Sequence, residues 1–445
     1  MLQPSPHVKY LSQSFGNQWL NCSFIDFKSR MLTTPVTFKT NNQLELGFKK
    51  PPSDTVPHII KYMGSKKPIL DFITNAIDEV HTPGKWVCDL FAGSCSISAA
   101  LRRKYDFISN DVQDYSRIIA HTYFSDLSIY HFDELQEQIE ATVNLHYMWF
   151  KQHYAEYFYD YSKIATLEEF AKIETKQRAL LANEDFDIDH HLFVKYYSGT
   201  YWSFEQCVWI DSLRKAAETF NNSQVYYSFL SSIMYAMSYT TQSTGHFAQY
   251  RDGDKQDAMK NIITYRIKDF YDHFIKKFKE LIETLDDSLK QLKTSTMDFT
   301  ECLETMPVGT TVYADPPYAP VHYSRFYHAL ETLVKYDYPK VEFKGRYRTD
   351  RHQSPFSQKT NAEDAFVNLF NGIVNKKANM ILSYSDNGVL NINQIIRLAE
   401  VSFHSNYHVS IQTIDHIHST MGRFDDPDRD VTEYLIIAKG MINYD

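Results

Sequence analysis

The sequence predicts an α/β fold: a doubly wound, mostly parallel sheet that is interrupted by a largely helical insertion. Two stretches predict the sheet, because residues 86–111 alternate apolar strands with a small-residue turn and a helix, and residues 311–437 return to this alternation. Strands that alternate with helices are typical of parallel sheets. Between these stretches the pattern becomes mixed, largely helical and rich in tyrosine and phenylalanine. One sheet with an inserted module accounts for this order.

The apolar pattern places the individual elements. A helix is predicted over 69–80, where apolar residues recur at helical spacing, and the Pro-Gly pair at 83–84 ends it. A second helix is predicted at 97–101. The predicted strands are 86–91, 107–111, 311–315, 380–383, 409–411 and 434–437.

The chain of 445 residues is long enough for two or three domains. Residues 1–55 are rich in Ser, Gln, Asn and Thr and are predicted to form an N-terminal extension. We predict the first part of the α/β domain over 56–124, the inserted domain over 125–289, and the second part of the α/β domain over 290–445.

Charge and cysteine content narrow the class of protein. The formal net charge of −9 disfavours a chain that is basic throughout but allows a local basic patch. The five cysteines are scattered without a CxxC pair, which disfavours disulfides and structural zinc. The apolar runs are shorter than the roughly 18 residues of a membrane span, and the chain does not open with a basic region followed by an apolar stretch. We expect a cytoplasmic protein with no membrane segment and no metal.

The strongest chemical signal is the tetrapeptide Asp315-Pro316-Pro317-Tyr318, directly after an apolar strand. Two consecutive prolines fix the backbone and remove two N–H donors, so the neighbouring carbonyls are free to act as acceptors. A carboxylate and a carbonyl can together accept both hydrogens of an exocyclic amine, and Tyr318 can stack on the ring that carries it. Such a site works by positioning and electrostatics, without a covalent nucleophile. A plain turn after the strand is the alternative.

A second signal follows the first strand, where an acid and a small-residue turn lead into a helix: Asp89-Leu90-Phe91-Ala92-Gly93-Ser94-Cys95-Ser96. In a doubly wound sheet a nucleoside-containing cofactor binds at this first βα turn. Asp111 ends the next strand 22 positions later (111 − 89), close to the offset of about 20 residues expected of an acid that bonds ribose hydroxyls. A helix N-cap is the alternative role for Asp89.

Together with a third segment, Tyr62-Met63-Gly64-Ser65-Lys66, these motifs resemble the Dam-like class of DNA adenine-N6 methyltransferases. The resemblance rests on the order of the motifs, and Asn110-Asp111, Asp298-Phe299 and the strand and loop at 380–386 also match. It implies a seven-stranded sheet, S-adenosylmethionine as the cofactor and double-stranded DNA as the substrate. The insertion then becomes the target-recognition domain.

The resemblance also assigns roles to particular residues. Asp315, Pro316, Pro317 and Tyr318 would hold a flipped adenine as the catalytic residues. The implied cofactor contacts are Tyr62, Lys66, Asp89, Phe91, Gly93, Asp111, Asp298 and Asp315. Cys95 stands where the family has its second loop glycine, and it adds a Cβ and a sulfur near the cofactor. Because cysteine is small, we expect cofactor binding to survive this departure.

Contact with DNA needs cations for the phosphates and side chains that read base edges. Residues 335–359 contain seven Lys or Arg and three acids, a local balance of +4. The DNA contacts predicted from this stretch are Lys344, Arg346, Arg348 and Arg351. In the insertion, Gln249 and Arg251 are the predicted base readers, since Gln suits adenine and Arg suits guanine. Residues 201–203 and 240–247 are also polar and aromatic enough to contact bases, and a solvated loop is the alternative for the charge run.

Several activities remain open at this point. Cytosine-N4 methylation uses the same amine chemistry, although those enzymes usually carry SPPY-like variants. Cytosine-C5 methylation is excluded because no cysteine here follows a proline. A catalytically silent DNA-binding specificity protein is disfavoured by the intact tetrapeptide, and an RNA or protein methyltransferase by the insertion and the motif order. The resemblance further implies a nucleoid-associated bacterial or phage protein, with a cognate restriction endonuclease as a partner to look for.

Overall fold

The structure is a computed structural model that describes residues 56–221, 223–242, 246–286, 289–319, 323–386, 388–418 and 429–441. The predicted extension over 1–55 lies outside the described residues. The strands are β1 (Val87–Asp89), β2 (Phe107–Asn110), β3 (Leu292–Ser295), β4 (Thr311–Ala314), β5 (Val341–Glu342), β6 (Tyr347–Arg348), β7 (Asn379–Ser385), β8 (Tyr407–His418) and β9 (Arg429–Gly440).

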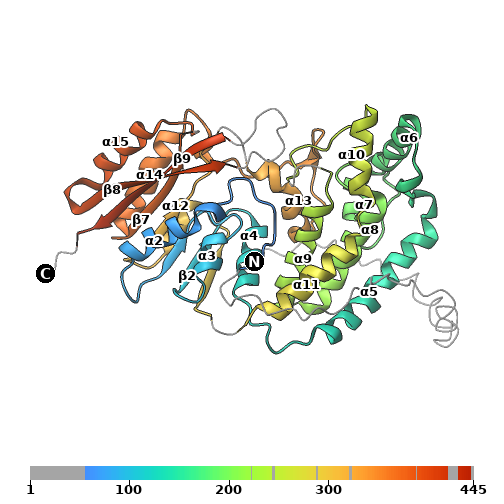
Figure 1. Ribbon diagram of the computed structural model, residues 1–445, viewed down its shortest axis with the longest axis horizontal. Coiled ribbons are helices and arrows are strands. Elements are labelled where there is room, and N and C mark those ends of the chain that lie inside the picture. Colours follow the sequence, from blue (N-terminus) through green and yellow to red (C-terminus); the bar gives the residue numbers. More distant parts are fainter. Residues whose placement is uncertain are drawn as a thin grey trace, which may run out of the picture. The chain divides into compact units, whose positions relative to one another are not determined.

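Helices make up most of the rest of the described chain (Figure 1). The α-helices are α2 (Leu70–Val80), α3 (Ser96–Leu101), α4 (Asp114–Tyr123), α5 (Phe132–His153), α6 (Leu167–Arg178), α7 (Leu192–Tyr197), α8 (Phe204–Ala217), α9 (Gln224–Thr240), α10 (Gln256–Arg266), α11 (Phe270–Thr284), α12 (Phe299–Thr305), α13 (Ser324–Lys335), α14 (Ala362–Asn375) and α15 (Ile392–Phe403). The 3₁₀ turns are η1 (Lys67–Ile69), η2 (Ala155–Tyr157), η3 (Tyr161–Lys163), η4 (Ala179–Ala182), η5 (Glu218–Phe220), η6 (Pro355–Ser357) and η7 (His404–Asn406).

One seven-stranded sheet has the order β3-β2-β1-β4-β7-β9-β8 within the described residues. The pairs among β3, β2, β1, β4 and β7 are parallel. β9 runs antiparallel to both of its neighbours, β7 and β8. The predicted doubly wound, mostly parallel sheet is therefore confirmed.

Helices cover both faces of the sheet (Figure 1). Along β4, Val312 and Ala314 belong to a core that includes residues of α12, α14 and α15, whereas Tyr313 between them belongs to a core with α2 and α3. This alternation follows from the period of two along a strand. Because both faces are covered, the central strands are buried throughout, which explains their continuous apolar runs.

The order of the strands in the sheet determines where a ligand can bind. From β1 it proceeds outward to β2 and β3, and it then returns to the other side of β1 with β4. The order therefore reverses between β1 and β4, and ligands in such sheets bind outside the carboxyl ends of the strands at this point. Asp89 is the last residue of β1, and Asp315 directly follows β4.

Three strands escaped prediction for physical reasons. β3 has the sequence Leu-Lys-Thr-Ser and is an edge strand paired only with β2, so it is half exposed and carries no apolar run. The antiparallel pair β5–β6 lies inside the charged stretch and is only two residues long on each side. Composition does not mark these strands: β3 forms by pairing with β2, and β5 and β6 form by pairing with each other.

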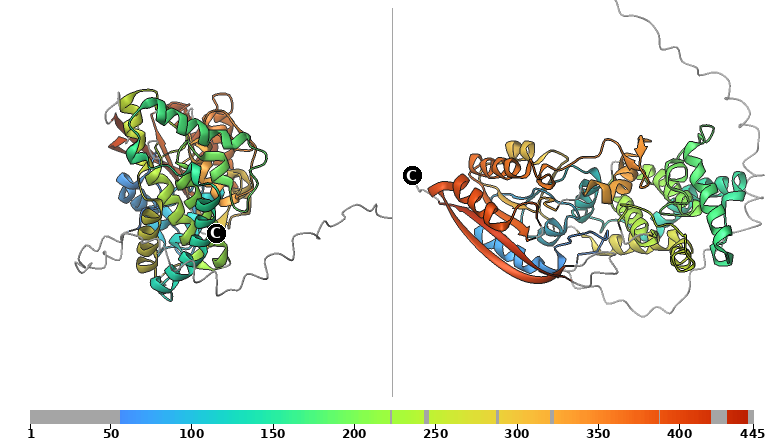
Figure 2. Two further views of the ribbon diagram at one scale, coloured as in Figure 1. Left: turned by 90° about the vertical axis from the view of Figure 1, so that its right-hand side faces the viewer. Right: turned by 90° about the horizontal axis from the view of Figure 1, so that it is seen from above.

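The segment predicted as an insertion is helical from α5 to α11 (Figure 2). Its helix α9 packs against α4 of the α/β part, where Thr122 and Ser231 hydroxyls lie 2.7 Å apart. Much of the aromatic surplus is core, since Tyr197, Tyr201 and Trp202 are 0% exposed. The expectation that residues 201–203 contact bases is wrong, because Tyr201 and Trp202 are fully buried and Ser203 is 3% exposed, and buried side chains cannot reach DNA. In the expected segment 240–247, residues 240–242 are also 0% exposed, and 243–245 lie outside the described residues.

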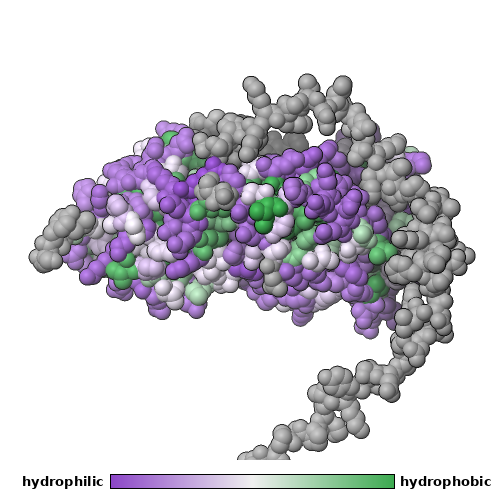
Figure 3. Space-filling view, turned by 90° about the horizontal axis from the view of Figure 1, so that it is seen from below, coloured by the Kyte–Doolittle hydropathy of each residue, from purple (hydrophilic) through white to green (hydrophobic). Residues whose placement is uncertain are grey.

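The surface differs from this apolar interior. On the face shown in Figure 3, hydrophilic residues predominate and apolar residues form scattered groups between them. An exposed apolar residue is ordinary on folded proteins and does not by itself mark a binding site. Among the described residues, the helices are all too short or too polar to cross a membrane.

Candidate active site

A cavity of about 430 Å³ lies at the carboxyl ends of β1 and β4. All the residues that the sequence assigned to catalysis or to the cofactor line this cavity, with the exception of Gly93: Tyr62, Lys66, Asp89, Phe91, Asp111, Asp298, Asp315, Pro316, Pro317 and Tyr318. Segments that are more than 200 residues apart in sequence therefore meet where the strand order reverses. Gly93 lies directly beside the cavity, between the lining residues Ala92 and Ser94.

Asp111 is held by backbone donors. The N–H of Gly93 donates to its Oδ2 over 2.9 Å, and the N–H of Gln113 donates to its Oδ1 over 2.9 Å. Burial raises the pKa of Asp111 to about 6, although these two hydrogen bonds oppose the shift. Each carboxylate oxygen retains a second lone pair, so the group can still accept hydrogen bonds from a ligand.

Asp89 is the least satisfied acid of the cavity. Its Oδ2 is buried and accepts no hydrogen bond from the part of the chain that the structure describes. Burial raises its pKa to about 8, and the neighbouring charges of Asp315 and Asp111 add to the shift. A buried, partnerless carboxylate oxygen is costly, and a cationic or hydroxyl donor on a ligand would satisfy it.

Replacing Asp89 with asparagine should stabilise the ligand-free protein at neutral and higher pH. An aspartate whose folded pKa is raised from 3.8 to about 8 contributes stability below pH 4 that is lost as the pH rises through 8. Asparagine lacks this penalty, so the gain in Tm should grow between pH 4 and pH 8 while cofactor affinity falls. Thermal unfolding at several pH values measures the gain. Asp71→Asn, on an exposed aspartate of α2, should show neither effect, and an equal gain at all pH values would contradict the prediction.

Lys66 lies between two acids. Its Nζ is 3.3 Å from Asp315 Oδ1 and 2.5 Å from Oε1 of Glu433, which is on β9. Burial lowers the pKa of Lys66, but Asp315, Tyr318 and Glu433 together raise it well above its ordinary value. Burial raises the pKa of Asp315, and so does Glu433, while Lys66 opposes the shift. The catalytic candidate Asp315 thus shares one ammonium with a second carboxylate.

The proline turn offers fewer free carbonyls than its sequence suggests. Pro317 O accepts from the hydroxyl of Ser357 over 2.5 Å, and Tyr318 O accepts from the N–H of Val389 over 3.0 Å. Within the described residues no donor reaches the carbonyl of Pro316. The structure therefore narrows the acceptor pair for an amine to Asp315 and Pro316. The Tyr318 ring lies 4.5 Å from that of Tyr384, at 48°.

Aromatic contacts fix the walls of the cavity. The Tyr62 ring stacks on Tyr327 with centroids 4.7 Å apart and the planes at 14°. On the other side, Phe91 lies 5.4 Å from Phe356, edge to face. Asp298 caps α12 by accepting from Thr300 N over 3.0 Å, so only part of its carboxylate faces the cavity.

Cys95, the departure from the family pattern, points away from the cavity. Its Sγ lies 3.3 Å from Ser116 O and 3.4 Å from Ser116 Oγ, and the residue is 0% exposed. Its φ of 57° is the left-handed conformation that favours glycine. The left-handed backbone explains why the family pattern has a glycine here, and Cys95 does not line the cavity, although its neighbours Ser94 and Ser96 do.

Sequence reasoning missed several residues of the site. Glu433 gave no signal, since it precedes an apolar run in the last strand like many polar residues. Four residues of the segment 352–356, together with Tyr323, line the cavity: His352, Ser354, Pro355 and Phe356. Ser354 carries a buried hydroxyl that lacks a partner among the described residues. The motif Ser-Pro-Phe-Ser at 354–357 could have drawn attention, because Pro355 opens η6.

The predicted DNA contacts come from two distant segments, which the structure brings together. The Tyr201 hydroxyl bridges them, since it donates to Phe247 O over 2.6 Å and lies 3.0 Å from Gly345 O. Lys344 forms an ion pair with Asp252, and its Nζ lies 5.1 Å from the centre of the Tyr250 ring. Residues 246–252 and the β5–β6 hairpin therefore form one continuous surface.

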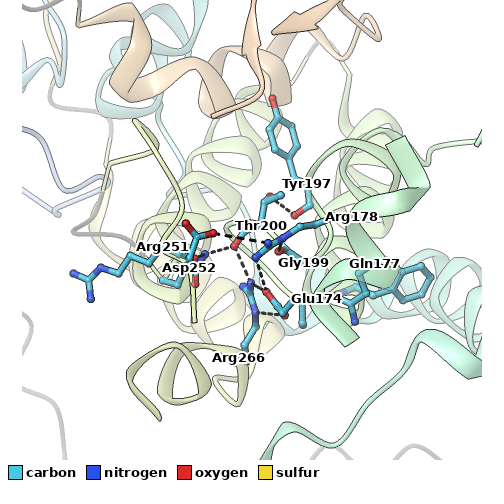
Figure 4. A network of polar contacts seen from close by, with 12 residues as sticks. Glu174, Gln177, Arg178, Tyr197, Gly199, Thr200, Arg251, Asp252 and Arg266 are labelled. Atoms are coloured by element: carbon cyan, nitrogen blue, oxygen red, sulfur yellow. Dashed lines mark hydrogen bonds and ion pairs between the residues drawn. The ribbon is translucent and has the colours of Figure 1, made fainter. Parts of the chain in front are cut away.

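Some of the six predicted DNA contacts face solvent on this surface. Gln249 and Lys344 are exposed, and Arg251 and Arg351 are half-buried. Figure 4 shows the Arg251 side chain extending away from the buried network beside it, and it bonds Asn261 over 2.8 Å. The Arg351 guanidinium lies 5.8 Å from the centre of the Tyr347 ring.

Arg346 and Arg348 are placed differently. Arg348 is 2% exposed, and both Asp337 and Asp350 hold its guanidinium at distances of 2.5–3.0 Å. Arg346 is 8% exposed and donates to the carbonyls of Tyr196 and Arg178. These arginines anchor the hairpin, and their burial argues against direct phosphate contacts. Two acids outside this stretch, Glu331 and Asp252, pair with Lys335 and Lys344 and reduce the local balance from +4 to +2 (4 − 2).

A buried network of ion pairs and hydrogen bonds lies next to this surface (Figure 4). Arg266 is fully buried and binds Glu174 at 2.8 Å and Thr200 O at 2.8 Å. Glu174 also lies 3.6 Å from Arg178, which in turn reaches Asp252 at 3.9 Å. Removing one partner of such a buried ion pair is costly. Through Arg178, this network therefore holds Asp252 and its neighbour Arg251 against α6.

Comparison with known proteins agrees with this geometry. The sequence model of the D12 class N6 adenine-specific DNA methyltransferases matches residues 62–382. The chain is 23% identical over 347 residues to the modification methylase LlaI of Lactococcus lactis subsp. lactis, which covers 76% of this chain and 48% of that protein. It is 26% identical over 350 residues to the type II methyltransferase M.FokI of Planomicrobium okeanokoites, covering 74% and 45%. The chain thus spans about half the length of these curated relatives.

A third relative has a higher sequence identity to this chain, but over a shorter stretch. Over 91 residues the chain is 38% identical to the type II methyltransferase M.CviAII of Paramecium bursaria Chlorella virus 1, which covers 19% of this chain and 26% of that protein.

Proposed function

The chain belongs to the D12 class N6 adenine-specific DNA methyltransferase family, and from this membership we propose that it methylates N6 of a flipped adenine in double-stranded DNA, with S-adenosylmethionine as the methyl donor. One observation carries the proposal. The Asp89 turn, suited to a nucleoside cofactor, and the Asp315 turn, suited to an exocyclic amine, open into the same cavity. A donor and an acceptor bound there would meet without a covalent intermediate.

The residues of the cavity fit the cofactor. The unpartnered Oδ2 of Asp89 suits the cationic amine of the methionine part, and the free lone pairs of Asp111 suit the ribose hydroxyls. Phe91 and Tyr62 offer apolar ring surface to the rest of the molecule. When bound, S-adenosylmethionine supplies an electrophilic methyl group on a sulfonium. Within the family a methyl donor is implied, and these groups support this particular one.

The acceptor side is built to hold an amine. Asp315 Oδ2 and the Pro316 carbonyl can each accept one N–H of the adenine amine, which turns the nitrogen lone pair away from them and toward the cofactor side of the cavity. Lys66 holds the other oxygen of Asp315 at 3.3 Å and keeps the carboxylate in place. Tyr318 provides a ring face for the extruded base, whose unstacking costs a few kcal/mol.

Cytosine-N4 methylation remains the alternative, since the amine chemistry is the same. The test is transfer of labelled methyl from S-adenosylmethionine to unmethylated duplex DNA, with Asp315→Ala beside the parent and the product digested to nucleosides. Label in N6-methyladenine with the parent and none with Asp315→Ala is expected. Label in N4-methylcytosine, no label at all, or equal label with the variant would refute the proposal. A parent that binds DNA but transfers no label would be the silent specificity protein.

We assign target recognition to residues 125–289 together with the β5–β6 hairpin. Gln249, Arg251, Lys344 and Arg351 face solvent on one surface and can reach base edges and phosphates. Phe343 lies at the hairpin tip, where it is 75% exposed and has a φ of 60°. A large apolar side chain held outward at this conformational cost suits contact with bases.

Lys344→Ala should weaken DNA binding and flatten its dependence on salt. Removal of one phosphate contact reduces the slope of log K against log salt by about 0.9. Titrations by fluorescence anisotropy at several salt concentrations measure this slope. Lys104→Ala is the matched control, because Lys104 is also an exposed lysine that is paired with an aspartate, Asp78, but it lies next to α3. Equal slopes for Lys344→Ala and the parent would mean that Lys344 does not contact a DNA phosphate.

The proposal extends to the cellular setting. Two relatives bear the name type II methyltransferase and one the name modification methylase, which supports a cognate restriction endonuclease as a partner and a cytoplasmic, nucleoid-associated place. Mapping the methylated sites on a sequenced DNA would give the recognition sequence. Protection of those sites from a nuclease encoded beside this chain would support the partnership, and cleavage of the methylated sites would contradict it.

A further inference from the structure

The last strand supplies the active site with an acid that none of the motifs contains. β9 runs antiparallel to β7, and Glu433, near its start, therefore lies opposite Ser385 at the carboxyl end of β7. A parallel strand would have placed its first residues at the opposite edge of the sheet. Glu433 is 1% exposed, and its Oε1 accepts from both the Lys66 ammonium, at 2.5 Å, and the Ser383 hydroxyl.

This arrangement divides Lys66 unequally between two carboxylates. The ammonium is closer to Glu433 than to Asp315, which it reaches at 3.3 Å through Oδ1. The ammonium comes closest to Asp315 at Oδ1, so Oδ2 is the oxygen that lies farther from it. The other titratable groups that face Asp315 are Asp89 on β1, Tyr313 on β4, and Tyr318 and Tyr323 on the following loop and the start of α13.

We propose that Glu433 is a positioning residue for the methyl transfer: it draws the Lys66 ammonium toward β9, so that Asp315 keeps one oxygen free to accept the hydrogen of the target amine. This inference rests on the proposed function, because the amine is its substrate. Without the charge of Glu433, the ammonium has only one carboxylate partner and moves closer to Asp315. It then competes with the amine for the same acceptor.

The test is Glu433→Gln, which preserves the shape and can still bond Ser383. Two changes are expected. The plateau value of kcat should fall by about ten- to a hundredfold, with little change in KM for DNA. The acidic limb of the kcat–pH profile should move to lower pH, because a carboxylate that raises the pKa of Asp315 has been removed. A merely structural role would lower kcat without moving the limb.

Lys66→Met removes the ammonium instead of the carboxylate, and it should shift the pH profile in the opposite direction. Loss of the ammonium leaves two acids facing each other, so the acidic limb should move to higher pH, and adding Glu433→Gln to it should reverse part of that shift. Asp415→Asn is the control, since Asp415 is an exposed acid on β8 that bonds Thr432, next to Glu433. It should leave both kcat and the pH profile at the parental values.

A measurement independent of catalysis separates this inference from the proposed function. The carboxyl group of Asp315 can be titrated by NMR in protein labelled at aspartate, without cofactor or DNA, and assigned with Asp315→Asn. Its pKa should fall in Glu433→Gln and rise in Lys66→Met, whether or not the parent methylates DNA. An unchanged titration, or a parental kcat plateau in Glu433→Gln, would overturn the inference. If Glu433→Gln does not fold, the Lys66→Met titration decides: a rise supports the shared ammonium, and no rise refutes it.

Discussion

Asp315→Asn should lower kcat by about 10²–10³-fold, the cost typical of losing one preorganised electrostatic contact in an active site. The amide keeps the shape of the carboxylate but offers one acceptor and two donors in place of two acceptors. Its NH₂ group would face either the adenine amine or the Lys66 ammonium, which lies 3.3 Å from Asp315 in the parent. Donor then meets donor, and the amine is no longer held with its lone pair toward the methyl group.

Steady-state rates at saturating DNA and cofactor measure this loss. DNA affinity should change little, because the proposed DNA-contact surface around Lys344 is formed by other segments. Asp106→Asn is the matched control: Asp106 directly precedes β2, at the opposite edge of the sheet, where it accepts from Gln291 N over 2.9 Å. A kcat within a few-fold of the parent for Asp315→Asn would mean that this carboxylate does not hold the amine.

Gly93→Ala should impair cofactor use and stability together. An added Cβ would lie 2.5 Å from the Tyr62 hydroxyl and 2.7 Å from Cζ of the same ring. Tyr62 cannot easily move aside, since its ring stacks on Tyr327 at 4.7 Å. In addition, φ at Gly93 is +51°, which an alanine adopts at a cost. We expect a loss of about 2–3 kcal/mol in unfolding free energy and a fall of about a hundredfold in kcat/KM for the cofactor.

Gly84→Ala is the control that separates the cost of the left-handed backbone from the cost of the clash with Tyr62. Gly84 has a φ of +77°, but nothing lies within 4 Å of an added Cβ. It should cost about 1 kcal/mol of stability and leave cofactor binding unchanged, as measured by calorimetry and chemical denaturation. If both glycine variants weaken cofactor binding equally, backbone strain alone is the cause, and the Tyr62 contact does not shape the site.

The sequence predicted those parts of the site that depend only on short stretches of neighbouring residues. Asp89 and Asp315 each end an apolar run and precede a turn, and the pattern of a strand followed by an acid is visible within ten residues. The predicted helix over 69–80 and the strand at 311–315 agree closely with α2 and β4 for the same reason. Local hydrophobic period and turn chemistry are properties of the chain itself, so they need no knowledge of what packs against them.

The basic stretch shows where this reasoning fails. A sequence records that Arg346 and Arg348 are charged but not whether they are exposed. Asp337 and Asp350 neutralise Arg348, and carbonyls of the insertion hold Arg346. Lys344, between the same strands, remains exposed. Burial depends on segments up to 168 residues away, and composition cannot separate an anchoring arginine from one that meets a phosphate.

By itself, the sequence determined the doubly wound sheet, the family and the two acids that line the cavity, because short local patterns and their order along the chain encode these features. Only the tertiary structure decided that Pro316 is the free carbonyl, that the hairpin joins the 246–252 segment, and that Glu433 shares Lys66 with Asp315. The physical reason is the same in each case. These features depend on which groups are already satisfied by distant partners, and the reversed direction of β9 alone brings Glu433 to the catalytic edge.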